Sequence, residues 1–305
     1  MTQIIQNILK NYENENAGVK SNLYRMMNTG ALAGTGRMVI LPVDQGFEHG
    51  PARSFAMNPG AYDPHYHYQL AVDSGCSAYA APLGPLQAGA NSFAGRVPTI
   101  LKFNSSNSLS SGNDDYDQAI TGSIQDALEL GCSAVGFTIY PGSDNQFELI
   151  EEVQEMIREA KSYGIASVVW SYIRGSGISK EGETAIDTVS YGAHIAALLG
   201  AHIIKVKLPS DHIEQKEAKK AFEENNIPIA TQEDRVREVV RSCFNGRRLV
   251  VFSGGAAKGA DAVYQDAKDI HNGGGNGSII GRNSFQREYG DSLDMLGKIM
   301  DIYKG

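Results

Sequence analysis

The chain has little of what marks several classes of protein. Among 305 residues there are three cysteines, Cys76, Cys132 and Cys243, which are far apart and odd in number. Such a set matches neither a disulfide framework nor a CxxC zinc knuckle, so we expect three buried, reduced thiols in a cytoplasmic protein. No run reaches the roughly 20 apolar residues of a membrane span. The N-terminus also lacks the basic and then apolar layout of a signal peptide.

Positive charge is scarce as well. There are 27 Lys and Arg against 35 Asp and Glu, which gives a formal net charge of -8. This balance argues against non-specific binding to nucleic acid or to anionic membranes. An anionic substrate would therefore need a locally basic site.

Short apolar segments rich in Val and Ile alternate with amphipathic helical stretches along the chain. This alternation is typical of βα units on a parallel sheet. Apolar residues at helical spacing predict clear helices at 146–163, 185–199, 214–224 and 233–244, whereas the Gly-rich stretch 87–96 is a weak candidate. The eight predicted strands are 38–44, 78–83, 99–104, 134–140, 167–172, 202–208, 249–253 and 278–281.

Eight βα repeats in about 260 residues match the usual size of a (β/α)8 barrel. We therefore predict an α/β protein with one TIM-barrel domain over residues 1–305, in which residues 1–37 form N-terminal capping helices. The alternative is a doubly wound open sheet, which would favour a GxGxxG turn after the first strand. The sequence at 45–50 is QGFEHG instead.

Two lysines lie within the predicted sixth strand, which has the sequence IIKVK at 203–207. Lys205 and Lys207 share one face, and facing the helix layer would bury two charges at high cost, so we expect them to face the barrel interior. Two ammonium groups in a partly dry site depress each other's pKa. Such a lysine is nucleophilic and can form a Schiff base with a carbonyl. The pattern does not choose between the two, and Lys102 in the third strand is a weaker candidate.

The first strand ends in a group of polar residues. Because barrel chemistry gathers at the carboxyl ends of the strands, Asp44 is expected to face the mouth of the barrel. Its alternative role is to cap a loop. We expect Glu48 and His49 to support the same loop, and a metal site built on His49 alone is not expected.

The fifth strand ends with two aromatic residues on one face, Trp170 and Tyr172. Tyr172 lies near the rim and beside the sixth strand, so its hydroxyl could reach a ligand. Core packing is the alternative for both rings. Arg174 and Gly175 follow, and a guanidinium just past the strand suits an anion.

The seventh and eighth strands end in glycine-rich turns, FSGGAAK at 252–258 and IIGRN at 279–283. Many barrels bind phosphate at these two loops, where glycines let backbone N–H groups approach the oxygens. Arg282 adds a bidentate donor. Two tight turns without a ligand are the alternative.

Five segments together resemble the class I fructose-1,6-bisphosphate aldolases of the archaeal and bacterial type. They are VDQGFEHGP at 43–51, WSYIRG at 170–175, IIKVK at 203–207, FSGGAAK at 252–258 and IIGRNSFQR at 279–287. The resemblance implies reversible aldol cleavage of fructose 1,6-bisphosphate through a lysine Schiff base, in glycolysis or gluconeogenesis. It also implies no metal or other cofactor, and a cytoplasmic homo-oligomer, with a decamer of two rings as the candidate.

The resemblance also implies roles for individual residues. Lys205 resembles the Schiff-base lysine, Tyr172 the proton-transferring residue and Asp44 the carboxylate that assists carbinolamine formation. Trp170 would form a wall of the substrate site, and Lys207 would be an accessory cation that lowers the pKa of Lys205. The implied phosphate-binding residues are Arg174, Gly175, Ser253, Gly254, Gly255, Gly281 and Arg282.

Two segments depart from the family pattern. The loop at 175–180 is longer than in archaeal members, so Lys180 is only a candidate for a phosphate-binding lysine of that loop. The connection at 210–248 is also long, and we expect its length to affect the rim of the barrel or the oligomer rather than the chemistry. Two other functions stay open: a Schiff-base aldolase, synthase or thiolase acting on another phosphorylated sugar, and a non-enzymatic phosphosugar-binding barrel.

Overall fold

A closed barrel of eight parallel strands forms the centre of the molecule. The structure is a computed structural model that describes residues 1–109, 116–253 and 258–305. The strand order is β1-β10-β9-β8-β7-β6-β3-β2, which confirms the (β/α)8 barrel and excludes an open sheet. The strands are β1 (Met38–Pro42), β2 (Ala78–Ala81), β3 (Thr99–Lys102), β6 (Ala134–Ile139), β7 (Ala166–Ser171), β8 (Ile203–Lys207), β9 (Leu249–Ser253) and β10 (Gly277–Ile279).

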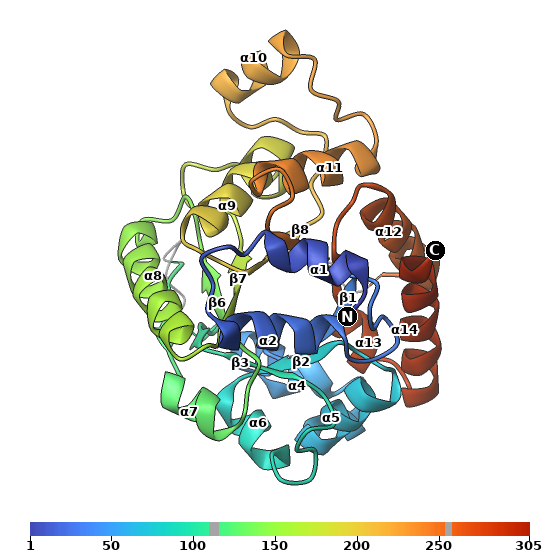
Figure 1. The fold of residues 1–305 in the computed structure, drawn as a ribbon. Helices are drawn as coiled ribbons and strands as arrows, with labels where there is room; N and C mark the ends of the chain where they lie inside the picture. The colour runs from blue at the N-terminus through green and yellow to red at the C-terminus, as the bar shows by residue number, and fades with distance from the viewer. Residues whose placement is uncertain (110–115, 254–257) are drawn as a thin grey trace.

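Helices surround the barrel, as Figure 1 shows. Those that follow the first two strands are α3 (Gln45–His49), α4 (Pro51–Phe55), η1 (Pro59–Tyr62), α5 (Pro64–Asp73) and α6 (Leu83–Gly89). The later ones are α7 (Ile124–Glu129), α8 (Gln146–Ser162), η2 (Gly182–Thr184), α9 (Ile186–Leu198), α10 (Lys216–Glu224), α11 (Gln232–Ser242), α12 (Ala260–Asn272), α13 (Arg282–Phe285) and α14 (Tyr289–Lys304).

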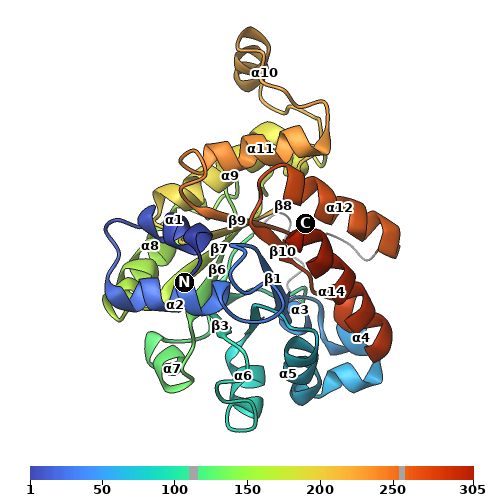
Figure 2. The same ribbon diagram turned by 45° about the vertical axis from the view of Figure 1, so that its right-hand side comes forward.

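The sequence-based boundaries differ from the structure at a few places. Helix α6 begins at Leu83, before the weak stretch 87–96. A small antiparallel pair, β4 (Asn104–Ser105) with β5 (Ala119–Ile120), follows β3 and was not predicted. Helix α10 projects beyond α11 in both ribbon views and has no buried residue (Figures 1 and 2).

Helices α1 (Gln3–Lys10) and α2 (Ala17–Met27) lie across the barrel in Figure 1. Val19 and Leu23 of α2 pack in one core with the inward-facing strand residues, among them Ile40 and Val168. Tyr12, between the two helices, donates a hydrogen bond from its hydroxyl to the carbonyl of His202 at 2.5 Å. Apolar contacts and this bond therefore hold both helices against one end of the barrel.

Strand β8 alternates between two cores. Ile204 and Val206 pack in the outer core, between the barrel and its helices, whereas Ile203 belongs to the inner core. Lys205 and Lys207 share the face of Ile203 and line a cavity at the mouth of the barrel. The prediction that both lysines face inward is confirmed.

Two expectations drawn from composition can be compared with the structure. Cys76, Cys132 and Cys243 are free and buried, which confirms that they form no disulfide framework. Among the helices in the described ranges, none combines the length and the apolar character needed to cross a bilayer.

Candidate active site

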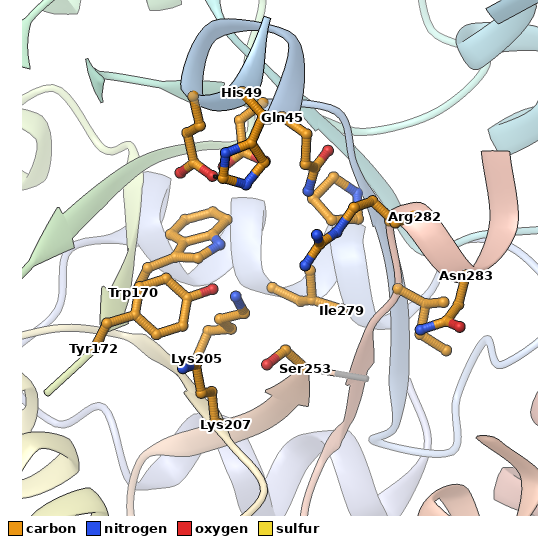
Figure 3. A pocket seen from close by; sticks show the side chains of 15 residues that line it. Gln45, His49, Trp170, Tyr172, Lys205, Lys207, Ser253, Ile279, Arg282 and Asn283 are labelled. Atoms are coloured by element: carbon orange, nitrogen blue, oxygen red, sulfur yellow. Dashed lines mark ion pairs between the residues drawn. The ribbon is translucent and has the colours of Figure 1, made fainter. Parts of the chain in front are cut away.

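A cavity opens where β1, β7, β8, β9 and β10 end. It brings together most of the residues singled out in the sequence, from strands far apart in the chain (Figure 3). Arg174 and Gly175 do not line it, and Gly254 and Gly255 lie outside the described residues. The lining residues are Pro42, Asp44, Gln45, Glu48, His49, Trp170, Tyr172, Lys205, Lys207, Ser253, Ile279, Ile280, Gly281, Arg282 and Asn283.

Lys205 is the most enclosed of the cavity's cations, with 4% of its surface exposed. Its Nζ lies 4.2 Å from the centre of the Tyr172 ring. Burial lowers the pKa of Lys205 to about 7, while Asp44 and Glu48 raise it in opposition and Lys207 lowers it further. The lowered pKa increases the neutral fraction of the side chain near pH 7, and the neutral form is the nucleophilic form of an amine.

Lys207 lies closer to the rim and is partly exposed. Burial lowers its pKa to about 8, and Arg174 adds to the effect. The expectation that Lys207 lowers the pKa of Lys205 is correct in direction, but the dry interior of the barrel is the larger cause.

Two carboxylates enter the cavity from the loop after β1. Asp44 is the N-cap residue of α3 and is 7% exposed, and the N–H of Glu48 donates to the Asp44 carbonyl at 3.3 Å. Burial and the nearby Asp44 raise the pKa of Glu48. The expectation that Glu48 supports this loop is incomplete, because its side chain also lines the cavity. The spacing of four residues from Asp44 is the signal that could have placed both on one helical turn.

Lys102, at the end of β3, is not part of the cavity lining and is 1% exposed. Its ammonium donates to the backbone carbonyl of Asn104 and, at 3.1 Å, to the Asn104 side-chain oxygen. The Asn104 amide in turn bonds both backbone groups of Thr138, at 2.9 and 2.7 Å. Lys102 is thus a fixed cation between β3 and β6 that does not line the cavity, which favours Lys205 as the nucleophile.

Trp170 forms one wall of the cavity (Figure 3), and a glycine makes room for its indole. A Cβ at Gly136 would meet two indole carbons at 2.4 and 2.8 Å. The same Cβ would lie 3.4 Å from a side-chain carbon of Ile100. The position of the ring therefore depends on the absence of a side chain at residue 136.

We expect Gly136→Ala to lower the free energy of unfolding by about 1–3 kcal/mol, because overpacked cores must shift. Trp170 is the single tryptophan of the chain, so its fluorescence emission should change as the ring moves. Thermal unfolding and emission spectra measure the two effects. Gly297→Ala is the matched control, because a methyl group there meets nothing within 4 Å. Unchanged stability and emission in Gly136→Ala would contradict the packing argument.

The opposite side of the cavity carries the predicted anion-binding residues. Figure 3 shows Arg282 and Lys205 entering the cavity from opposite sides, with Ser253 below them. A Cβ at Gly281 would lie 2.9 Å from both the Pro42 carbonyl and the Gln45 amide nitrogen, so glycine lets this loop approach the first loop. The arrangement places a guanidinium, a hydroxyl and a narrow backbone turn together, which are groups suited to an anion such as phosphate.

Arg174 and Gly175 lie at the rim of the barrel mouth, outside the cavity lining. Arg174 pairs with the Glu183 carboxylate at 2.9 Å. Gly175 has φ 142° and passes so close to Gly142 that a Cβ would lie 1.8 Å from its carbonyl oxygen. The Glu183 contact could not be predicted, because nothing in the local sequence marks Glu183 as the partner of Arg174 across the intervening loop.

The chain is also similar to known proteins in sequence and in structure. The model of the DeoC/LacD family of aldolases matches residues 38–287. The probable class 1 fructose-bisphosphate aldolase of Chlamydia muridarum is 35% identical, over 94% of this chain and 85% of that protein. The class 1 fructose-bisphosphate aldolase of Thermoproteus tenax is 32% identical, over 88% and 90%. An archaeal fructose-1,6-bisphosphate aldolase, solved with its catalytic lysine bound to a carbinolamine intermediate, superposes with a TM-score of 0.76 at 29% identity, covering 93% of this chain and all of that one.

Proposed function

Because the chain belongs to the DeoC/LacD family of aldolases, we propose that it cleaves fructose 1,6-bisphosphate reversibly, through a Schiff base on Lys205. The products are dihydroxyacetone phosphate and glyceraldehyde 3-phosphate. One observation carries the proposal: a buried lysine with a pKa near 7 faces Arg282 across a cavity at the mouth of the barrel.

In this proposal the reaction begins at the substrate ketone. The neutral amine of Lys205 attacks C2 and gives a carbinolamine, and Asp44 assists the proton transfers that release water. The resulting iminium withdraws electrons from the C3–C4 bond, which is the role a metal ion would have in a metal-dependent aldolase. The proposal therefore includes no metal and no other cofactor.

Tyr172 is the proposed proton-transferring group. The centre of its ring lies 4.2 Å from Lys205 Nζ, and both residues line the cavity. The phenolate form takes the proton of the C4 hydroxyl as the C3–C4 bond breaks and the aldehyde leaves. The phenol then returns a proton to C3 of the enamine, and hydrolysis of the iminium releases dihydroxyacetone phosphate.

Substrate orientation is the remaining requirement. Ser253, Gly281 and Arg282 are proposed to hold the phosphate on C1, so that C2 lies near Lys205 Nζ. Trp170 forms a wall beside the sugar chain, and Lys207 and Arg174 are proposed to supply positive charge near Tyr172. A homo-oligomer in the cytoplasm belongs to the same proposal, and light scattering tests the assembly.

Borohydride trapping tests the chemistry directly. Incubation with dihydroxyacetone phosphate and borohydride should add the mass of the reduced adduct to Lys205, as located by peptide mapping. A panel that includes fructose 1,6-bisphosphate and other phosphorylated sugars then decides the substrate. If Lys205 is trapped but the bisphosphate is not cleaved, the Schiff-base assignment stands and fructose 1,6-bisphosphate is excluded as the substrate.

The pH profile should report the pKa of Lys205. Above its folded pKa of about 7 the amine is neutral, and below it the ammonium predominates. We expect kcat/KM for the bisphosphate to fall with decreasing pH on an acid limb centred near 7. Lys207→Met removes a nearby cation and should move this limb to higher pH by less than about one unit, because burial is the larger cause. A limb centred near the ordinary lysine pKa would contradict the assignment.

A further inference from the structure

The carboxylate of Glu183 lies among three cations at the rim of the active site. Its oxygens are 2.9 Å from Arg174 Nη1, 2.9 Å from Lys180 Nζ and 3.8 Å from Lys207 Nζ. Glu183 and Arg174 are mostly buried, with side chains 12% and 18% exposed, whereas Lys180 is 87% exposed. One anion therefore faces three positive charges in a partly dry place.

This group borders the catalytic cavity. Lys207 lines the cavity, and its Nζ lies 5.9 Å from the centre of the Tyr172 ring. The Arg174 guanidinium lies 6.0 Å from the same ring. In Figure 3, Lys207 and Tyr172 lie on one side of Lys205, and Arg282 lies on the other. A sugar with a phosphate at each end, anchored at Arg282, would direct its second phosphate toward Lys207 and Arg174.

Arg174 also has contacts with groups other than Glu183. Its guanidinium lies 5.7 Å from the centre of the Tyr116 ring and 6.0 Å from the centre of the Tyr172 ring. It also donates to the carbonyl of Ile173 at 2.7 Å. Removing the carboxylate should therefore leave an ordered cation with an unfilled hydrogen-bonding capacity, which is what binds phosphate.

The backbone that carries Glu183 is fixed as well. The Ser179 hydroxyl donates to Glu214 at 2.7 Å and accepts from the Gly182 N–H at 2.9 Å, and the Thr188 hydroxyl donates to the Gly182 carbonyl at 2.5 Å. The Glu183 side chain can thus change rotamer while the loop stays in place.

From this geometry we propose that Glu183 determines specificity as an internal anion that competes with the substrate's second phosphate for Arg174 and Lys207. A doubly charged phosphate displaces the carboxylate, because it offers more charge and three acceptor oxygens. A substrate with a singly charged carboxylate in place of the second phosphate has no such advantage over the Glu183 carboxylate. The inference rests on the proposed function, since it assumes that the first phosphate binds at Arg282.

The test compares two substrates that differ only in the second phosphate. Fructose 1-phosphate shares the first phosphate and the ketone with the bisphosphate, so the ratio of the two kcat/KM values reports on the rim. Glu183→Gln should raise this ratio by about 3- to 10-fold, through a lower KM for the bisphosphate, because a charge is removed beside cations that range from mostly buried to exposed. Kinetics with fructose 1-phosphate should stay close to wild type.

Matched variants separate competition from a structural role. Glu181→Gln removes a charge from the same loop at an 83% exposed side chain and should leave the ratio unchanged. Glu183→Asp keeps the charge and should keep the ratio nearer to that of wild type than Glu183→Gln does. A ratio that stays constant or falls in Glu183→Gln overturns the inference, as does an equal loss of kcat with both substrates.

A binding measurement makes the outcome independent of catalysis. In isothermal titration, inorganic phosphate should bind Glu183→Gln about 3- to 10-fold more tightly than wild type, and Glu181→Gln should match wild type. If the wild-type protein cleaves neither sugar, the proposed function fails, and this titration alone decides the role of Glu183. Equal phosphate affinity in wild type and Glu183→Gln would then reject it.

Discussion

Lys205→Met is expected to reduce kcat for bisphosphate cleavage by at least about 10⁴-fold, because the variant has no amine to form the covalent intermediate. Methionine fits the same buried space and brings no charge into it, so the barrel should stay as stable as wild type or gain stability. Steady-state cleavage and thermal unfolding measure the two effects. Borohydride with dihydroxyacetone phosphate should add no mass to the variant.

Lys102→Met is the matched control for this prediction. Lys102 is also buried on a barrel strand, but its ammonium is bound by Asn104 and does not line the cavity. The control should still be trapped at Lys205, even if its activity changes through the lost charge. A trapped adduct in Lys205→Met, at Lys102 or Lys207, would show that the nucleophile is misassigned.

The barrel could be predicted from the sequence because its signals are local. Each strand is a short apolar run, and the alternation along β8 placed Ile204 and Val206 outward and both lysines inward. Strand ends were less accurate: β1 ends at Pro42 rather than at residue 44, because Asp44 begins the turn of α3. The pair β4 and β5 has two residues in each strand, which is too short to leave a periodic pattern.

The site could be predicted only in part, because local sequence patterns place strand ends but do not place contacts between loops. Residues at strand ends are brought together by the barrel itself, so Lys205, Tyr172 and Arg282 meet in one cavity as expected. Contacts between loops have no such rule. The pairing of Glu183 with Arg174 and the cavity-facing position of Glu48 depend on loop conformations that no period encodes. The role of burial in the Lys205 pKa likewise depends on the packed barrel around it.

Tyr172→Phe is expected to lower kcat for cleavage by about 10²- to 10⁴-fold, which is the usual contribution of a positioned proton-transfer group. The ring that lies 4.2 Å from Lys205 Nζ is kept, so the pKa of the lysine and the shape of the cavity wall should change little. Schiff-base formation depends more on the amine of Lys205 than on the hydroxyl of Tyr172. Borohydride trapping at Lys205 should therefore persist in the variant while turnover fails.

Tyr140→Phe is the matched control, because its hydroxyl accepts from the Gln118 amide at 2.8 Å and its side chain does not line the cavity. This variant should keep kcat within about threefold of wild type, as expected for a group that transfers no proton in the reaction. The split between trapping and turnover is what separates a proton-transfer role for Tyr172 from a packing role. If Tyr172→Phe loses trapping and turnover together, the phenol supports the lysine instead. If it loses neither, the proton goes to another group, and Glu48, which lines the same cavity with a raised pKa, is the next residue to replace.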